Sequence, residues 1–157
     1  MTQLNIDSTD RKILSALQKD ARLSNYELAE QLSLAPSTCL RRTKQLFDSG
    51  IIQGFHAQLD RDKLGLNGVA FVNIRLEKQN EKAFREFELA AAAIPAVQDV
   101  YLVSGEYDYV IRVIYRDAKD FELLYTRSIL SLPGIASTNT RLVLREVYHS
   151  REISLQS

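Results

Sequence analysis

The segment from Ser24 to Gly50, SNYELAEQLSLAPSTCLRRTKQLFDSG, constrains the fold more than any other part of the chain. Apolar residues recur at helical spacing in two stretches, and the few residues between them leave room only for a tight corner. The second stretch carries Arg41, Arg42 and Lys44. Two short helices, a tight corner and a cationic second helix are typical of a helix-turn-helix, which places that second helix in the DNA major groove.

The predicted helices have recognisable start signals. Ser24 and Glu27 form the S-x-x-E capping box at the start of the first of these two helices. Pro36 suits the first turn of the next helix. We expect a further helix upstream, beginning near Asp7 or Ser8, because either side chain can accept a hydrogen bond from the first turn. Its apolar stripe consists of Ile6, Ile13, Leu14 and Leu17.

The helix that begins at Pro36 divides into two faces. Helical spacing predicts an inward face of Leu40, Thr43, Leu46 and Phe47. Hydroxyl and amide side chains can bond to base edges, and arginine can pair with guanine through two hydrogen bonds. The predicted DNA-contacting residues are Ser37, Thr38, Arg41, Arg42 at the margin, Lys44 and Gln45. The alternative is a three-helix bundle whose basic face is only solvated.

The residues that follow this helix favour a small wing. Gly50 can end the helix in a left-handed conformation. The sequence IIQGFHAQLD then has strand-forming residues on both sides of Gly54. Two positions weaken the motif: Ser33 occupies a corner that favours glycine, and Ala35 cannot cap the third helix with its side chain.

From Gly68 onwards, apolar residues alternate with polar ones, which is typical of a strand with one buried face. A helix with Phe84, Phe87, Ala91 and Ile94 on one side follows. Two strands flanking the turn at residues 105–108 then predict a hairpin. The order strand-helix-strand-strand-helix-strand is the ferredoxin-like arrangement. The remaining elements are predicted at residues 97–104, 109–115, 120–132 and 137–147.

We therefore expect an α+β chain with a winged helix-turn-helix at residues 1–60, a linker at 61–67 and a ferredoxin-like βαββαβ domain at 68–157. Two helices can cover only one face of the sheet. Phe71 and Val103 are predicted on the other face, which is too apolar to be left in water. A second copy of the chain is expected to cover it.

Composition excludes other classes of protein. The net charge is zero, which argues against a protein coated with positive charge that compacts DNA without sequence preference. No apolar run approaches the roughly 18 residues of a membrane-spanning helix. The single cysteine, Cys39, cannot form an internal disulfide, so we expect a cytoplasmic protein. Neither histidine belongs to a cluster with metal-ligand spacing, so no metal or other cofactor is expected.

Six segments in this order and spacing resemble the leucine-responsive/AsnC family of transcriptional regulators, also called feast/famine regulators. The matching pieces are IDSTDRKIL, SNYELAEQL, CLRRTKQL, GIIQGFHAQLD, LVSGEYDYVIRV and LPGIASTNTRLVLREV. The resemblance covers nearly the whole chain. It implies a DNA-binding regulator that forms homodimers through the C-terminal sheet. These dimers often assemble into octamers. It also implies that the C-terminal domain binds a free amino acid.

The resemblance also implies an effector site at the hairpin and at the start of the last strand. The residues are Gly105, Tyr107, Asp108, Thr138 and Thr140. Asp108 can accept hydrogen bonds from an amino acid's ammonium group. The hydroxyls and the backbone near Gly105 can donate to its carboxylate. The alternative is that Gly105 and Asp108 only form the turn, where both residue types are common.

An enzyme on the same scaffold is the second hypothesis, because siroheme decarboxylases resemble this layout. Such an enzyme should place histidine and arginine in a C-terminal cleft to bind an anionic tetrapyrrole. His56 lies in the predicted wing and His149 lies beyond the last predicted strand. No catalytic residues can be assigned, and the regulator is the favoured interpretation.

Overall fold

The computed structural model describes residues 6–150 and 152–155, which form two compact units. The N-terminal unit extends to Gln58 and also includes the described residues from Tyr148 onwards; the C-terminal unit comprises Leu59–Val147. The first of the two divisions along the chain falls between Gln58 and Leu59. Two domain predictions need correction, because residues 61–67 belong to the C-terminal unit and the end of the chain returns to the N-terminal unit.

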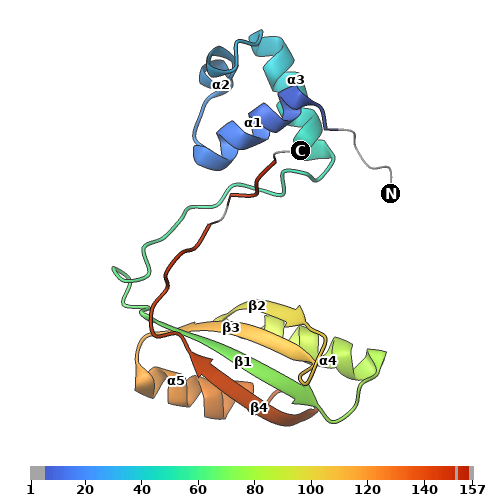
Figure 1. The fold of residues 1–157 in the computed structure, drawn as a ribbon, viewed down its shortest axis with the longest axis vertical. Helices are drawn as coiled ribbons and strands as arrows, with labels where there is room; N and C mark the ends of the chain where they lie inside the picture. The colour runs from blue at the N-terminus through green and yellow to red at the C-terminus, as the bar shows by residue number, and fades with distance from the viewer. Residues whose placement is uncertain (1–5, 151, 156–157) are drawn as a thin grey trace. The chain divides into compact units, whose positions relative to one another are not determined.

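The described part of the N-terminal unit contains three helices: α1 (Ser8–Lys19), α2 (Asn25–Gln31) and α3 (Pro36–Asp48) (Figure 1). Both predicted caps are present. Asp7 accepts from the Asp10 N–H in a capping box, and Ser24 forms the second box with Glu27. The core contains apolar residues from all three helices: Ile13, Leu14, Ala16, Leu17, Leu28, Ala29, Cys39 and Leu46.

The inward face of α3 differs from the prediction. Leu46 is 1% exposed and Cys39 is fully buried, whereas Leu40 is 58% exposed. Phe47 is also exposed, and its ring contacts Phe55 edge-on with centroids 5.4 Å apart. The helix therefore buries the stripe containing Cys39 and Leu46. Leu46 was predicted to face inward, so the buried face is the predicted one turned toward Cys39 and away from Leu40 and Phe47.

The two ends of α3 have the predicted backbone features. Ser33 has a φ of 54°, a left-handed conformation that is uncommon for residues other than glycine. No side chain caps α3 at Ala35, and Gly50 follows the helix with a φ of 76°. Beyond Gly50 the prediction of wing strands is wrong for this structure, since residues 51–60 contain no strand. Ile51 and Ile52 instead pack against the helical core.

The described end of the chain docks on α1. The side chain of Gln18 accepts from the Ile153 N–H at 2.7 Å and donates to the Ile153 carbonyl at 3.1 Å. Leu155 packs against the helical core, and its carbonyl accepts from Arg11 at 3.4 Å. A groove of about 450 Å³ lies between α1, residues 51–58 and this tail. The groove and the tail therefore belong to the N-terminal unit.

The described part of the C-terminal unit contains a four-stranded antiparallel sheet in the order β2-β3-β1-β4. The strands are β1 (Gly68–Leu76), β2 (Val97–Leu102), β3 (Tyr109–Tyr115) and β4 (Ile135–Leu142). Both β2 and β4 are shorter than predicted. The sheet order and the two intervening helices confirm the ferredoxin-like βαββαβ arrangement.

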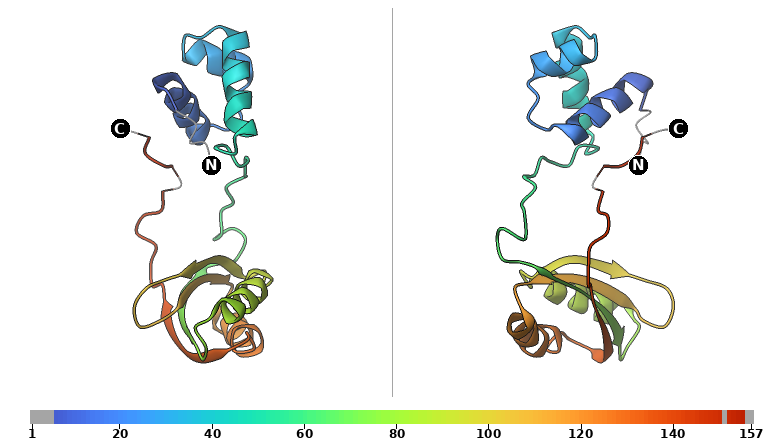
Figure 2. Two further views of the ribbon diagram at one scale, coloured as in Figure 1. Left: turned by 90° about the vertical axis from the view of Figure 1, so that its right-hand side faces the viewer. Right: turned by 60° about the vertical axis from the view of Figure 1, so that its left-hand side comes forward.

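Both helical segments of this unit cover the same face of the sheet (Figure 2). Helix α4 (Glu81–Ala92) buries Phe87 and Ala91, as predicted. The second predicted helix is instead divided into α5 (Ala118–Leu124) and the π-helical turn η1 (Tyr125–Ile129). The core between helices and sheet includes Val72, Ile74, Tyr109, Ile111, Val113 and Ile129.

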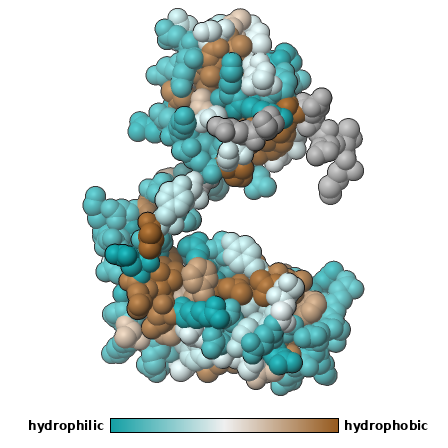
Figure 3. All heavy atoms as spheres, in the orientation of Figure 1, coloured by the Kyte–Doolittle hydropathy of each residue, from teal (hydrophilic) through white to brown (hydrophobic). Residues whose placement is uncertain are grey.

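The opposite face of the sheet has no covering helix within the described C-terminal unit. Apolar side chains form a band among polar ones over this unit (Figure 3). Phe71 lies between Arg112 on β3 and Arg141 on β4, and Arg112 forms an ion pair with Asp99. Tyr101 on β2 is 54% exposed. The face is more polar than predicted, and it combines aromatic rings with charged groups.

Candidate DNA-binding and effector sites

The outer face of α3 presents most of the predicted DNA-contacting residues to solvent. Ser37, Arg41, Lys44 and Gln45 are exposed, and Thr38 is half-buried. Arg41 donates to the Gln45 side chain at 3.0 Å, one helical turn further along. Because both partners are exposed, this bond is easily exchanged for one to a phosphate or a base. The helix can therefore place a mixed basic and polar surface in a groove.

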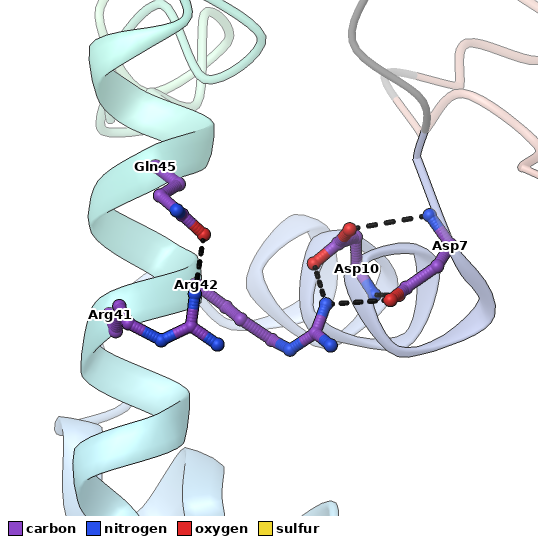
Figure 4. A network of polar contacts seen from close by, with 5 residues as sticks. All are labelled: Asp7, Asp10, Arg41, Arg42 and Gln45. Atoms are coloured by element: carbon purple, nitrogen blue, oxygen red, sulfur yellow. Dashed lines mark hydrogen bonds and ion pairs between the residues drawn. The ribbon is translucent and has the colours of Figure 1, made fainter.

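Arg42 lies apart from this set (Figure 4). Its Nη1 donates to Asp7 Oδ2 at 2.7 Å and to Asp10 Oδ1 at 2.9 Å. The bond from the Asp10 N–H, supported by Arg42, holds the pKa of Asp7 below its usual value. Hydrogen bonds to Asp10 and Asp7 raise the pKa of Arg42. Arg42 therefore differs from the exposed residues of α3 by its contact with the cap of α1.

Leu40 was predicted to face inward on α3 but is exposed. Its exposed side chain lies one turn before Lys44 on the same helix. An apolar side chain in the major groove can contact the methyl group of thymine. Helical spacing also permits a buried stripe of Cys39 and Leu46. Burial of that stripe leaves the Leu40 side chain outside the core.

The predicted effector residues lie on two sides of β1. Gly105 has a φ of 121°, and a side chain there would meet nothing within 4 Å, so backbone conformation rather than space favours glycine. Tyr107 is half-buried in the same turn. Thr138 lies on β4 opposite Ile74, whose partner on the other side is Tyr109. Within one chain, β1 therefore separates the hairpin residues from the threonines.

Asp108 is buried and forms two side-chain hydrogen bonds. Its Oδ2 accepts from the Leu76 N–H at 2.8 Å, and its Oδ1 accepts from the Gln79 side chain at 2.8 Å. Its own N–H donates to the Ile74 carbonyl at 3.0 Å. The carboxylate thus ties the start of β3 to the end of β1. An ionised carboxylate has about four acceptor positions, so these two bonds use half of them.

The threonines of β4 face the π-helical turn. Thr138 Oγ1 and the Tyr125 hydroxyl share a hydrogen bond of 2.5 Å. Thr140 Oγ1 is buried and has no hydrogen-bond partner among the described residues. Single π-helical turns occur frequently at functional sites. Nearby, burial and the Glu88 carboxylate raise the pKa of the Tyr109 hydroxyl, which donates to Glu88 at 2.8 Å.

Other kinds of site have little support in the described residues. Residues 6–150 and 152–155 contain no group of three or more histidine, cysteine, aspartate or glutamate side chains placed to hold a metal ion. No helix in these ranges is both long enough and apolar enough to cross a membrane.

Two family models match the chain, one for each part. Residues 6–53 match a winged helix-turn-helix DNA-binding domain, and residues 69–153 match the Lrp/AsnC ligand binding domain. The leucine-responsive regulatory protein of Escherichia coli K12 is 35% identical over 153 residues, which cover 98% of this chain and 93% of that protein.

Solved structures agree in fold along nearly the whole chain. A transcriptional regulator from Neisseria meningitidis in complex with L-methionine has a TM-score of 0.90 at 33% identity, covering 96% of this chain and 97% of that one. An AsnC family regulator from Agrobacterium tumefaciens also has a TM-score of 0.90, at 29% identity with 95% and 97% coverage. A feast or famine regulatory protein from M. tuberculosis, complexed with L-methionine, has a TM-score of 0.82 at 28% identity with 95% and 99% coverage.

A winged helix-turn-helix joined to a ligand binding domain defines a DNA-binding transcriptional regulator. The chain belongs to the Lrp/AsnC family. The predicted family and fold class are thereby confirmed. The relatives are regulators rather than enzymes, which also decides against the decarboxylase hypothesis.

Proposed function

We propose that this regulator reads DNA with the outer face of α3 and changes its DNA affinity or assembly when an amino acid binds to the C-terminal unit. The DNA-contacting residues are Ser37, Thr38, Arg41, Lys44 and Gln45. The exposed basic and polar face of α3, opposite a buried Leu46, is the observation that carries the proposal. Side chains of these types suit both phosphates and base edges.

The double substitution Arg41→Ala/Lys44→Ala is expected to weaken binding to a duplex selected from a random library with the wild-type chain. A lost arginine–guanine pair costs roughly 1–3 kcal/mol. Each lost phosphate contact lowers the salt dependence of binding by about one unit. Fluorescence anisotropy at several salt concentrations measures both effects. Lys82→Ala, which removes an exposed charge from α4, is the matched control. Unchanged affinity in the double variant would remove α3 from the interface.

The second part of the proposal is a homodimer formed by the sheet face that lacks helices, with octamers as a further assembly. Phe71 and Tyr101 supply aromatic surface on that face. Arg112 and Asp99 already neutralise each other there, which lowers the cost of covering them. Two copies related by a twofold axis would present two α3 helices to a symmetric DNA site.

The third part of the proposal is an amino-acid effector site that includes Gly105, Tyr107, Asp108, Thr138 and Thr140. Two structural relatives of the chain are complexes with L-methionine, which makes methionine the first candidate. The remaining acceptor positions of Asp108 suit an ammonium group, and Thr140 has a buried hydroxyl with no partner among the described residues. Because β1 separates these groups within one chain, a site that uses both requires more than one copy.

Asp108→Asn tests the effector site while preserving the fold. Asparagine can still accept from the Leu76 N–H, and a flipped Gln79 amide can accept from the new amide group. Loss of a charged hydrogen bond predicts L-methionine binding weakened by roughly 10- to 100-fold in calorimetry. Sedimentation velocity with and without methionine reports the assembly state. Equal methionine affinity in both proteins would exclude Asp108 from the site.

A further inference from the structure

Arg42 is bonded to the two carboxylates at the start of α1. Its Nη1 donates to one oxygen of Asp7 and one of Asp10, at 2.7 and 2.9 Å. The other oxygen of Asp7 accepts from the Asp10 N–H at 2.8 Å, and the other oxygen of Asp10 accepts from the Asp7 N–H at 3.3 Å. All four carboxylate oxygens are therefore engaged, and the guanidinium is joined directly to the cap of α1.

The burial of this cluster distinguishes Arg42 from its neighbour in sequence. The side chain of Asp10 is 12% exposed and that of Arg42 is 25% exposed. Its Nε is buried without a partner among the described residues. Arg41, in contrast, is exposed and donates to Gln45 of its own helix. Because Nη1 is bonded to both carboxylates, any contact of Arg42 with DNA would place those two carboxylates beside the phosphates.

The other contacts between α1 and α3 have little directionality. They are made by apolar side chains such as Ile13, Leu14, Cys39 and Leu46, and apolar burial depends weakly on orientation. The first turn of α3 also lacks a side-chain cap at Ala35. The hydrogen bonds from a guanidinium to two carboxylates have a defined geometry. Arg42 lies near the middle of α3, so these bonds act on the centre of the helix. It can therefore fix the rotation of α3 about its own axis.

We propose that Arg42 is a positioning residue, which sets the angle at which α3 presents Arg41 and Lys44 to DNA by binding the Asp7–Asp10 cap. This inference rests on the proposed role of α3. The two proposals can fail separately. Unchanged DNA affinity in Arg41→Ala/Lys44→Ala would show that α3 does not contact DNA, whereas the variants below test only the contact of Arg42 with Asp7 and Asp10.

Asp7→Asn separates positioning from simple electrostatics. Asparagine is as good an N-cap as aspartate, so α1 keeps its start. The variant makes the N-terminal unit more positive and frees Arg42 from one partner. Electrostatics or a direct Arg42–phosphate contact would therefore strengthen DNA binding, whereas loss of positioning weakens it. We expect roughly three- to tenfold weaker binding to the selected duplex and a smaller loss on random duplex.

Glu30→Gln is the matched control, since it removes one negative charge from an exposed position on α2. It should leave binding unchanged or strengthen it slightly. Arg42→Lys is the second variant, because a lysine keeps the charge but lacks the rigid guanidinium that carries Nη1 between the two carboxylates. It should also weaken selected-duplex binding, with the slope of log affinity against log salt unchanged.

All affinities are measured by anisotropy well below the melting temperature of each variant, so that loss of folded protein cannot mimic loss of positioning. Tighter or equal binding by Asp7→Asn would overturn the proposal. Wild-type affinity in Arg42→Lys would do the same, because a lysine can replace an arginine that only neutralises a phosphate. An equal loss on selected and random duplex would also contradict it.

Discussion

Replacing Leu46 by alanine is expected to lower the free energy of unfolding of the N-terminal unit by about 2–5 kcal/mol. Leu46 is 1% exposed and belongs to the core shared by α1, α2 and α3. A unit of this size rarely has more than about 3–5 kcal/mol of stability from its core. The substitution should therefore leave a large fraction of the DNA-binding unit unfolded and abolish DNA binding at working concentrations.

Leu40→Ala is the matched control, because it makes the same change on the same helix at a position that is 58% exposed. Its effect on stability should stay within about 0.5 kcal/mol. Hydrogen exchange followed by mass spectrometry can be read separately for peptides of α1–α3 and of the sheet. Protection should fall in α1–α3 only for Leu46→Ala. Equal effects of the two substitutions would show that the assigned inward face of α3 is wrong.

Asp108→Ala is expected to destabilise the C-terminal unit by about 2–3 kcal/mol. The substitution removes the acceptor of the Leu76 N–H at the end of β1 and of the Gln79 side chain. A buried N–H left without a partner costs more than the hydrogen bond contributes. The loss should be local, because the bond from the Asp108 N–H to the Ile74 carbonyl uses only the backbone.

Asp108→Asn should recover most of this stability, since its amide can satisfy both partners. Hydrogen exchange of the peptides containing β1 and β3 measures the difference between the two variants. If alanine proved as stable as the wild type, the contacts of Asp108 would not hold the sheet together. Methionine binding is therefore best tested with Asp108→Asn. In Asp108→Ala, weaker binding could result either from a lost ligand contact or from a destabilised sheet.

The sequence was sufficient wherever a structural feature depends on residues close together in the chain. The capping box of Ser24 and Glu27, the start of α3 at Pro36 and the strained corner at Ser33 all follow from local backbone chemistry. The pairing of β2 with β3 also followed, because the short turn at residues 105–108 joins two strands that are adjacent in the chain. The basic face of α3 was visible for the same reason.

The tertiary structure alone decided features that depend on partners distant in sequence. Leu40 and Cys39 are adjacent and both apolar, so spacing could not say which one would be buried; packing against α1 and α2 selected Cys39. Arg41 and Arg42 are identical in type, yet Asp7 and Asp10 bind only the second. The return of Ile153 to Gln18 joins residues separated by nearly the whole chain. Local sequence specifies backbone conformation, whereas the role of a side chain is decided by which groups the fold brings within hydrogen-bonding distance.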